Sequence, residues 1–512
     1  MTAKAGLPIS TVRAEHDAVR TYLADKLDPE QLRHVLFPAF NQWQFALDAL
    51  AETALACQEL GTQVTFAFWS GKTPMADTGW TTSHLLANLM KSPTLDQRYA
   101  RALRAAGFED SAFASPPIQR WRPEAPLPVV HDLRRSSIRE LSYRGSPVGR
   151  AILQVRPEPM TPTAEDHPWP RRWVEKSIRS YAFVYDQMTR LIADRGITTL
   201  ITYNGRFLHD RAAVAAARDL GVSVIYYDLG GLDTGFDLTT DETHDWSALQ
   251  DRMKAMYARW PGDERDEVGS RWFLDRSAHR DPWNAHFIDG QKQGEQVELP
   301  QGECTVVYFS SSSDEIAELD VDWTEYFDNQ DTAVRLVADI CKRIPGYRLV
   351  IRSHPHKRHK PTRDVQDWYR LVDEIKPDLH IDAHSPVDSY ELMRQADLVI
   401  TYGSTTGVEA AFAGKPVIVL GPSAYDELDC AARPHTPKEL EDAIRQREIR
   451  SPDNAILFGL MMKRRGFTLQ RITKNEDGTR SLAGVPLVEP RMSVRHGSHM
   501  LARWRRQHFN RR

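Results

Sequence analysis

Residues 396–420 read Ala396-Asp-Leu-Val-Ile-Thr-Tyr-Gly-Ser-Thr-Thr-Gly-Val-Glu-Ala-Ala-Phe-Ala-Gly-Lys-Pro-Val-Ile-Val-Leu420. The apolar runs 397–402 and 416–420 predict two buried strands, and the spacing of residues 405–413 predicts a helix between them. Gly414 lies where the C-cap of that helix is needed. A strand, a helix and a second strand in this order form the unit from which parallel α/β sheets are built.

The same alternation extends in both directions from this segment. In the second half of the chain, we predict strands at 305–309, 347–352 and 379–382 and helices at 331–343, 386–395 and 436–446. In the first half, an earlier series has strands at 34–40, 63–69, 198–203 and 222–228 and helices at 44–60, 173–194 and 210–220. Two such series predict an α/β fold with two facing Rossmann-like domains that contain parallel sheets.

We expect three regions along the chain. An N-terminal Rossmann-like domain covers 1–295 and contains an irregular, proline-rich insertion at about 71–172. A second Rossmann-like domain covers 296–450, and 451–512 form a C-terminal extension. The boundary between the two domains is expected within 281–302, because these residues are polar and show no clear periodicity.

The composition is that of an ordinary globular enzyme. Of the 512 residues, 41% are hydrophobic and 27% are charged, which excludes a disordered or a collagen-like chain. No run of about 18 apolar residues predicts a transmembrane helix, and residues 1–20 lack the apolar core of a signal peptide. The four cysteines lie far apart without a CxxC pair, which argues against a zinc site or a disulfide framework. We therefore expect a cytoplasmic protein.

The end of the chain is strongly basic, with seven arginines and no acid between 491 and 512. One interpretation is a segment that contacts an anionic membrane, which would place the protein peripherally at the inner face of that membrane. The other interpretation is a solvated terminus. The net charge of −4 is too near neutral to indicate nucleic-acid binding by the whole chain.

Polar residues follow the first strand of the segment quoted above. Gly403 permits a tight turn, and Ser404, Thr405 and Thr406 open the next helix, where free N–H groups and the helix dipole favour a phosphate. Glu409 lies one turn further on, where its carboxylate could accept hydrogen bonds from a ribose diol. In the alternative interpretation, the hydroxyl groups only cap the helix and Glu409 is a solvated acid.

A second polar group follows the strand predicted at 347–352. Arg352 and His354 would project at the carboxyl end of this strand, and Pro355 ends the regular structure. The Arg352 guanidinium can bind two phosphate oxygens at once, and His354 could donate a hydrogen bond to a diphosphate leaving group. The basic residues that follow, 357–360, add positive potential but are typical of a surface loop.

Four serines follow the strand predicted at 305–309, namely Ser310, Ser311, Ser312 and Ser313. Such a run suits a loop that presents N–H and O–H groups to an anion. A flexible polar linker would have the same composition. The acids Asp314 and Glu315 come next and could cap or catalyse.

The first series carries polar residues at corresponding places. Asn204 and Arg206 follow one strand, and Asp228 ends the next strand. Because ligands bind at the carboxyl ends of the strands in such sheets, these residues would line the opposite, acceptor side of the cleft. Asp228 is a candidate catalytic base.

Together these motifs resemble the capsule polysaccharide biosynthesis family of bacterial glycosyltransferases, which have the two-domain glycosyltransferase-B (GT-B) architecture. The resemblance is carried by residues 142–145, 204–206, 310–315, 352–355, 403–409 and 414–416. It spans about 142–420 and rests on the order and spacing of the motifs that follow strands.

The resemblance implies the transfer of a hexosyl or ulosonic-acid group from a nucleotide-sugar to a polysaccharide or glycolipid acceptor. The second domain would hold the donor: Arg352, His354 and the Ser/Thr helix start would bind its phosphates and stabilise the departing diphosphate, and Glu409 would bind its ribose. No cofactor is implied, and such enzymes are usually metal-independent. The chain agrees with this, because the carboxylate pair of Asp320 and Asp322 lacks further metal ligands nearby.

Three alternatives stay open from the sequence. One is a CDP-glycerol-type glycerophosphotransferase, because those enzymes share a His-Pro motif. Another is a nucleotide-sugar epimerase on the same fold, and the third is a non-catalytic subunit that binds a nucleotide-sugar. The sugar, the base, the acceptor and the anomeric outcome are not specified by these motifs, and Asp228 stands where the family would have a glutamate.

Overall fold

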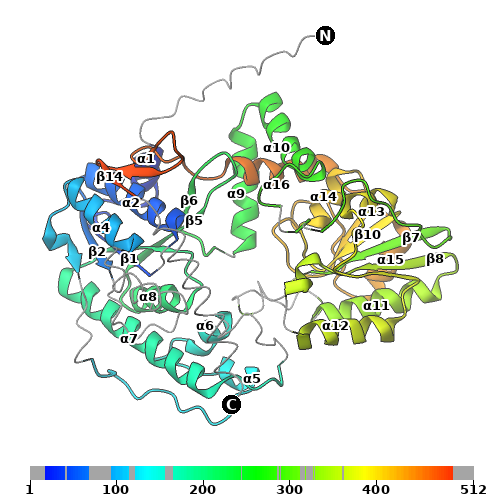
Figure 1. The fold of residues 1–512 in the computed structure, drawn as a ribbon, viewed down its shortest axis with the longest axis horizontal. Helices are drawn as coiled ribbons and strands as arrows, with labels where there is room; N and C mark the ends of the chain where they lie inside the picture. The colour runs from blue at the N-terminus through cyan, green and yellow to red at the C-terminus, as the bar shows by residue number, and fades with distance from the viewer. Residues whose placement is uncertain are drawn as a thin grey trace.

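The computed structural model describes residues 18–40, 43–68, 94–114, 121–155, 165–243, 245–284, 287–288, 290–311, 318, 327, 329–359 and 362–487. Several predicted features lie outside these residues, namely parts of the insertion, Ser312, Ser313, Asp314, Glu315, the pair Asp320 and Asp322, and the basic tail at 491–512. The described chain forms two α/β domains that face each other, each with its own sheet (Figure 1). The predicted fold class is confirmed.

Along the described chain, the sheet of the first domain has six strands in the order β3-β2-β1-β4-β5-β6. The strands are β1 (His34–Ala39), β2 (Gln63–Phe68), β3 (Phe113–Ala114), β4 (Thr199–Tyr203), β5 (Ser223–Leu229) and β6 (Phe236–Thr239). All neighbours are parallel except β5 and β6. The central strands β1 and β4 are buried throughout, which explains why they read as continuous apolar runs.

Helices cover both faces of this sheet. They are α1 (Ala18–Lys26), α2 (Gln44–Glu59), α4 (Leu95–Ala105), α5 (Arg135–Arg139), α6 (Val148–Gln154), α7 (Arg171–Arg195) and α8 (Leu208–Asp219), with a 3-10 turn η1 (Asp110–Ala112). Side chains alternate across the strands, so Leu36 packs in a core with α6, α7 and α8, while Val35 and Phe37 pack in a core with α1, α2 and α4.

The sheet of the second domain is fully parallel, with the order β11-β10-β7-β8-β9 among the described residues. Its strands are β7 (Cys304–Phe309), β8 (Tyr347–Arg352), β9 (Leu379–Ile381), β10 (Leu398–Thr401) and β11 (Val417–Val419). Its helices are η3 (Pro355–His359), α11 (Gln330–Arg343), α12 (Thr362–Ile375), α13 (Ser389–Gln395), α14 (Thr406–Phe412) and α15 (Pro437–Gln446). Both sheets therefore share the Rossmann strand order.

Three helices connect the domains: α9 (Trp246–Arg259), α10 (Gly262–Ser277) and α16 (Pro452–Arg464), which lie together at the top of Figure 1. Helices α10 and α16 approach so closely that a Cβ on Gly459 would lie 2.2 Å from the Gly269 carbonyl oxygen. Met253, Trp272 and Phe273 of α9 and α10 pack in the core of the second domain. The structure thus differs from the expected boundary at 281–302, because the chain leaves the first domain before α9.

The residues after α16 return to the first domain. Phe467 bridges to Phe236 of β6, and Leu482 and Leu487 pack in the core beside α1 and α2. The small strands β12 (Thr473–Lys474), β13 (Arg480–Leu482) and β14 (Val485–Pro486) lie on that domain in Figure 1. The predicted extension 451–512 is therefore, up to residue 487, an integral part of both domains rather than an appendage.

The two domains also contact each other across the cleft. Glu318, which follows β7 in the chain, is buried against the first domain, where its carboxylate accepts hydrogen bonds from Arg135 at 2.7 Å and from Arg139 at 2.9 and 3.1 Å. A second, exposed ion pair joins Arg363 of α12 to Asp166 at 3.1 Å. Within the described residues, no helix has both the length and the apolar character needed to cross a membrane.

Candidate active site

The strand order of the second sheet reverses at its centre. The chain moves outward from β7 through β8 to β9 and then returns to β10 on the other side of β7. In open α/β sheets, ligands bind outside the carboxyl ends of the strands at such a switch point. The strands β8, β7 and β10 are adjacent and in register. The loops that follow them are those predicted to hold the donor, and the structure places them along one edge.

Gly403 shapes the loop after β10. Its φ is 82°, and a Cβ there would lie 2.3 Å from a carbonyl oxygen of the neighbouring loop, so that only glycine fits without a shift. The turn lets the Ser404 N–H donate to Thr401 Oγ1 at 3.1 Å and the Thr406 N–H donate to Ser404 Oγ at 3.3 Å. Thr405 is exposed. Because α14 has only 7 residues, the loop geometry contributes more to this site than the helix dipole.

The loops after β7 and β8 are joined by hydrogen bonds. Ser310 N–H donates to the Arg352 carbonyl oxygen at 3.0 Å, and Ser310 Oγ accepts from the His354 N–H at 2.8 Å. The Ser311 N–H donates to Gln330 Oε1 at 2.6 Å. Ser311 Oγ is buried and has no hydrogen-bond partner among the described residues. The first serine therefore organises the backbone, and the second keeps a hydroxyl that a ligand can use.

His354 is half-buried at the end of β8. Its Nδ1 accepts a hydrogen bond from the His356 N–H at 3.2 Å, and the centres of the His354 and Phe287 rings lie 5.8 Å apart in an edge-to-face arrangement. An imidazole that accepts at Nδ1 carries its proton on Nε2 when it is neutral. The hydrogen bond thus selects the tautomer in which Nε2 is a donor.

The structure places Arg352 differently from the sequence expectation. Its side chain is 1% exposed and does not project from the strand end, because its guanidinium turns toward the loop after β9. There Nη1 donates to the Asp382 carbonyl oxygen at 2.5 Å, and Nη2 lies 3.5 Å from the Val387 carbonyl oxygen. Burial lowers the pKa of Arg352 to about 10. Its guanidinium is therefore held by the loop after β9, although Arg352 precedes His354 by only two residues in the chain.

Glu409 lies on the buried side of α14 and is 7% exposed. Its Oε1 accepts from Arg276 Nε and from the Tyr390 hydroxyl, the latter at 3.2 Å. Arg276 also pairs with Asp281 at 3.2 Å. Glu409 is therefore not the solvated acid of the alternative interpretation.

The acceptor-side residues of the first domain meet at the ends of β4 and β5. Asn204 Nδ2 donates to Asp228 Oδ2 at 2.6 Å, and the Leu229 N–H donates to Asp228 Oδ1 at 2.7 Å. Burial raises the pKa of Asp228, and these hydrogen bonds partly oppose the rise. Arg206 lies over the Phe207 ring at 5.1 Å and is half-buried.

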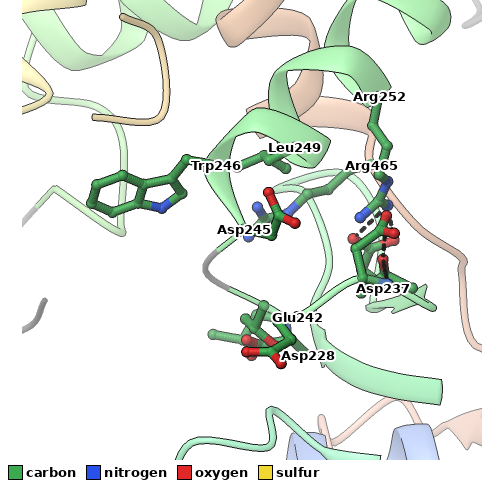
Figure 2. A pocket seen from close by; sticks show the side chains of 12 residues that line it. Asp228, Asp237, Glu242, Asp245, Trp246, Leu249, Arg252 and Arg465 are labelled. Carbon is green, nitrogen blue, oxygen red and sulfur yellow. Dashed lines mark hydrogen bonds and ion pairs between the residues drawn. The ribbon is translucent and has the colours of Figure 1, made fainter. Parts of the chain in front are cut away.

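Asp228 lines a cavity of about 200 Å³, shown in Figure 2. Asp237 accepts two hydrogen bonds from Arg252, each at 2.8 Å, and Figure 2 shows the Trp246 ring extending away from this pair. Arg465 lines the same cavity from the segment after α16. Sequence reasoning missed these lining residues, because they follow no strand of the parallel series and converge only through the return of the chain. Neither here nor elsewhere in the described part of the chain are three or more His, Cys, Asp or Glu placed to hold a metal ion.

Part of the second domain matches a known protein family. Residues 321–448 match the model of a family described as capsule polysaccharide biosynthesis protein. This segment, about a quarter of the chain, is similar to that family. It includes His354, Arg352 and Ser404 but begins after Ser310. Over this segment, the match confirms the resemblance to the capsule polysaccharide biosynthesis family that was predicted from the sequence.

Several solved structures are similar to this chain at low sequence identity. The β-Kdo 2,4-transferase of Thermosulfurimonas dismutans KpsC is 14% identical, with 52% of this chain and 79% of that chain covered and a TM-score of 0.33. The β-Kdo 2,7-transferase of the same organism is 15% identical, with 62% of this chain and 89% of that chain covered and a TM-score of 0.34. MurG of Acinetobacter baumannii is 13% identical, with 92% of this chain and 99% of that chain covered and a TM-score of 0.26. These TM-scores support no argument by themselves, and the fold assignment rests on the strand order. No curated protein matches the sequence.

Proposed function

We propose that the chain transfers a sugar from a nucleotide-sugar to a hydroxyl group of a polysaccharide or glycolipid acceptor. One observation carries this proposal. The loops after β7, β8 and β10 follow adjacent strands at the switch point of the second sheet, while the first domain presents a cavity with a half-buried, hydrogen-bonded carboxylate at Asp228. A diphosphate site and a candidate base on two facing domains are what a direct transfer between two bound substrates requires.

The donor would bind to the second domain. The Ser311 hydroxyl, the Nε2–H of His354 and the loop from Gly403 to Thr406 would hold the two phosphates, together with Ser310 and the predicted contributors Ser312 and Ser313. Each of these groups donates hydrogen bonds, which phosphate oxygens accept. Glu409 would accept a hydrogen bond from the ribose. Arg352 would contribute indirectly, because its hydrogen bond to the loop after β9 holds in place the segment that carries His354.

The chemistry follows from this placement. The acceptor hydroxyl oxygen forms a bond to the anomeric carbon as the bond from that carbon to the phosphate oxygen breaks, and the acceptor proton passes to Asp228. Negative charge then develops on the departing diphosphate, where the His354 Nε2–H and the hydroxyl groups of the loops would stabilise it. The raised pKa of Asp228 makes this carboxylate a stronger base than an exposed one.

A turnover assay tests the proposal. Purified full-length chain is incubated with UDP-, CDP- and GDP-sugars, with and without lipid-linked or oligosaccharide acceptors, and both the free nucleotide and the glycosylated product are measured. We expect nucleoside diphosphate release that requires acceptor and equals product formation. Epimerisation of the donor without transfer, transfer of glycerol phosphate from CDP-glycerol, or donor binding with no product would each contradict sugar transfer and identify the corresponding alternative.

The basic tail carries a separate part of the proposal. Seven arginines at 491–512 would hold the enzyme against an anionic membrane at its inner face, where lipid-linked acceptors are available. Vesicle sedimentation tests this. The full chain should bind vesicles that contain phosphatidylglycerol and not neutral vesicles, and equal binding after the arginines are replaced by glutamine would overturn the assignment.

A further inference from the structure

We propose that Arg276 is a positioning residue for the nucleotide ribose, because it fixes and neutralises Glu409 so that the second carboxylate oxygen faces the ribose hydroxyls. The inference rests on the proposed donor site, and it adds a residue that lies outside the segment matched to the capsule family. Arg276 ends α10, a helix that connects the two domains rather than part of the sheet that would bind the donor.

The hydrogen bonds to the Glu409 carboxylate go to only one of its two oxygens. Arg276 Nε and the Tyr390 hydroxyl both donate to Oε1. Asn284 Nδ2 donates in turn to the Tyr390 hydroxyl at 3.1 Å, which orients the phenol toward the carboxylate. Among the described residues, Glu409 Oε2 accepts no hydrogen bond. A carboxylate held in this way has one oxygen anchored and the other available for a hydroxyl donor.

The guanidinium of Arg276 is itself fixed on three sides. It donates to Glu409, pairs with Asp281 at 3.2 Å and lies over the Trp272 ring at 4.6 Å. Arg276 and Glu409 are 9% and 7% exposed. A planar guanidinium with this many contacts has little rotamer freedom left, so it can set the direction of the carboxylate with precision.

The charge of Arg276 matters as much as its geometry. A buried carboxylate without a cation is strongly disfavoured and takes up a proton instead. Arg276 supplies such a cation directly to Glu409 Oε1. Because α10 packs closely on α16, the orientation of Glu409 is also tied to the helices between the domains.

The test compares two probes that differ only in the ribose hydroxyls. The full-length chain is titrated with the tightest binder among ADP, CDP, GDP and UDP and with its 2′,3′-dideoxy counterpart. The wild type should prefer the ribonucleotide by roughly tenfold or more, as expected for hydrogen bonds to a charged acceptor. Arg276→Met should reduce this ratio to about one. Arg276→Lys keeps the charge and should retain part of the preference.

The matched control lies on the same helix. Arg271 pairs with Glu267 at 2.8 Å in an exposed position, so Arg271→Met should leave the ratio unchanged. If the wild type shows no preference, Glu409 does not bind the ribose and that part of the proposed function fails. If the wild type prefers the ribonucleotide and folded Arg276→Met does so equally, the positioning role is overturned. Should Arg276→Met fail to fold, Tyr390→Phe removes the other donor to Oε1 and must reduce the ratio, or the inference is wrong.

Discussion

Asn204 donates a hydrogen bond of 2.6 Å to the carboxylate of Asp228, which joins the ends of neighbouring strands β4 and β5. Asn204 has a φ of 51°, a left-handed conformation that asparagine tolerates better than most residues. The turn brings its amide toward Asp228, and the hydrogen bond favours the ionised carboxylate that a base requires. An asparagine that follows a strand thus has a specific role in the acceptor-side cavity.

Replacing Asp228 separates its catalytic role from its effect on stability. Asp228→Asn should lower the rate of transfer by roughly 10²–10⁴-fold, the usual range for loss of a general base. The pKa of Asp228 is raised in the folded protein. Between the ordinary and the raised pKa, the folded protein therefore binds more protons than the unfolded chain. The stability of the folded protein falls as the pH rises through that window. Above that window the cost of the ionised, half-buried carboxylate is fully present. Thermal unfolding of Asp228→Asn should therefore occur at or above the wild-type temperature, and a marked drop would contradict this.

The pH dependence of transfer tests the bond between Asn204 and Asp228. Activity should fall as the pH falls through the pKa of Asp228, and this acid limb should lie above the ordinary aspartate value of about 3.9. The Asn204 hydrogen bond lowers that pKa, so Asn204→Ala should move the limb to still higher pH. Rates measured against pH at saturating donor decide the point. A limb that stays in place in Asn204→Ala would show that the titrating group is not Asp228.

Two glycines of one segment provide a matched comparison. Gly403 and Gly414 have φ values of 82° and 73°, but a Cβ would clash only at Gly403, since nothing lies within 4 Å of one at Gly414. Gly414→Ala should cost about 1–2 kcal/mol for the left-handed backbone alone. Gly403→Ala should cost more and should also weaken donor binding, because the loop must move. Urea unfolding and donor titration of both variants test this, and equal effects would contradict the role of Gly403 in the site.

The two ion pairs between the domains should differ in strength. Glu318 is buried against Arg135 and Arg139, so Glu318→Gln leaves the buried Arg135 with only the exposed Glu165 at 3.5 Å as a partner and should destabilise the protein by about 3 kcal/mol. Asp166→Asn breaks the exposed pair with Arg363 and should cost at most about 1 kcal/mol. The midpoint of the first urea transition measures both. A small effect in Glu318→Gln would mean that its contact is not kept in solution.

The regular elements could largely be predicted from the sequence. Strand β8 has the predicted bounds, Tyr347–Arg352, and α11 begins one residue earlier than the predicted 331–343. Parallel strands that are buried on both faces read as uninterrupted apolar runs, and amphipathic helices keep their period, so both signals are local. The polar residues that follow the strands could then be predicted as candidate ligand-binding residues, because ligands bind at the carboxyl ends of the strands in such sheets.

Tertiary relationships could not be predicted in the same way. Periodicity shows that α9 and α10 have apolar faces, but not that Met253 and Trp272 pack in the second core. The inward turn of Arg352 depends on carbonyl groups of the loop after β9, and Arg465 reaches the Asp228 cavity because the chain recrosses between the domains. No local sequence pattern indicates these contacts, because the residues that they join lie far apart in the chain.

The most direct test is the calorimetric dissociation constant for the nucleoside diphosphate that the enzyme releases, measured on wild type, Ser311→Ala, His354→Ala and Ser404→Ala. If the loops after β7, β8 and β10 form one diphosphate site, each substitution should weaken binding about tenfold or more, while His435→Ala, an exposed histidine before α15, should bind like the wild type. Wild-type affinity in all three loop variants, with each one folded, would contradict a shared donor site at this edge of the sheet.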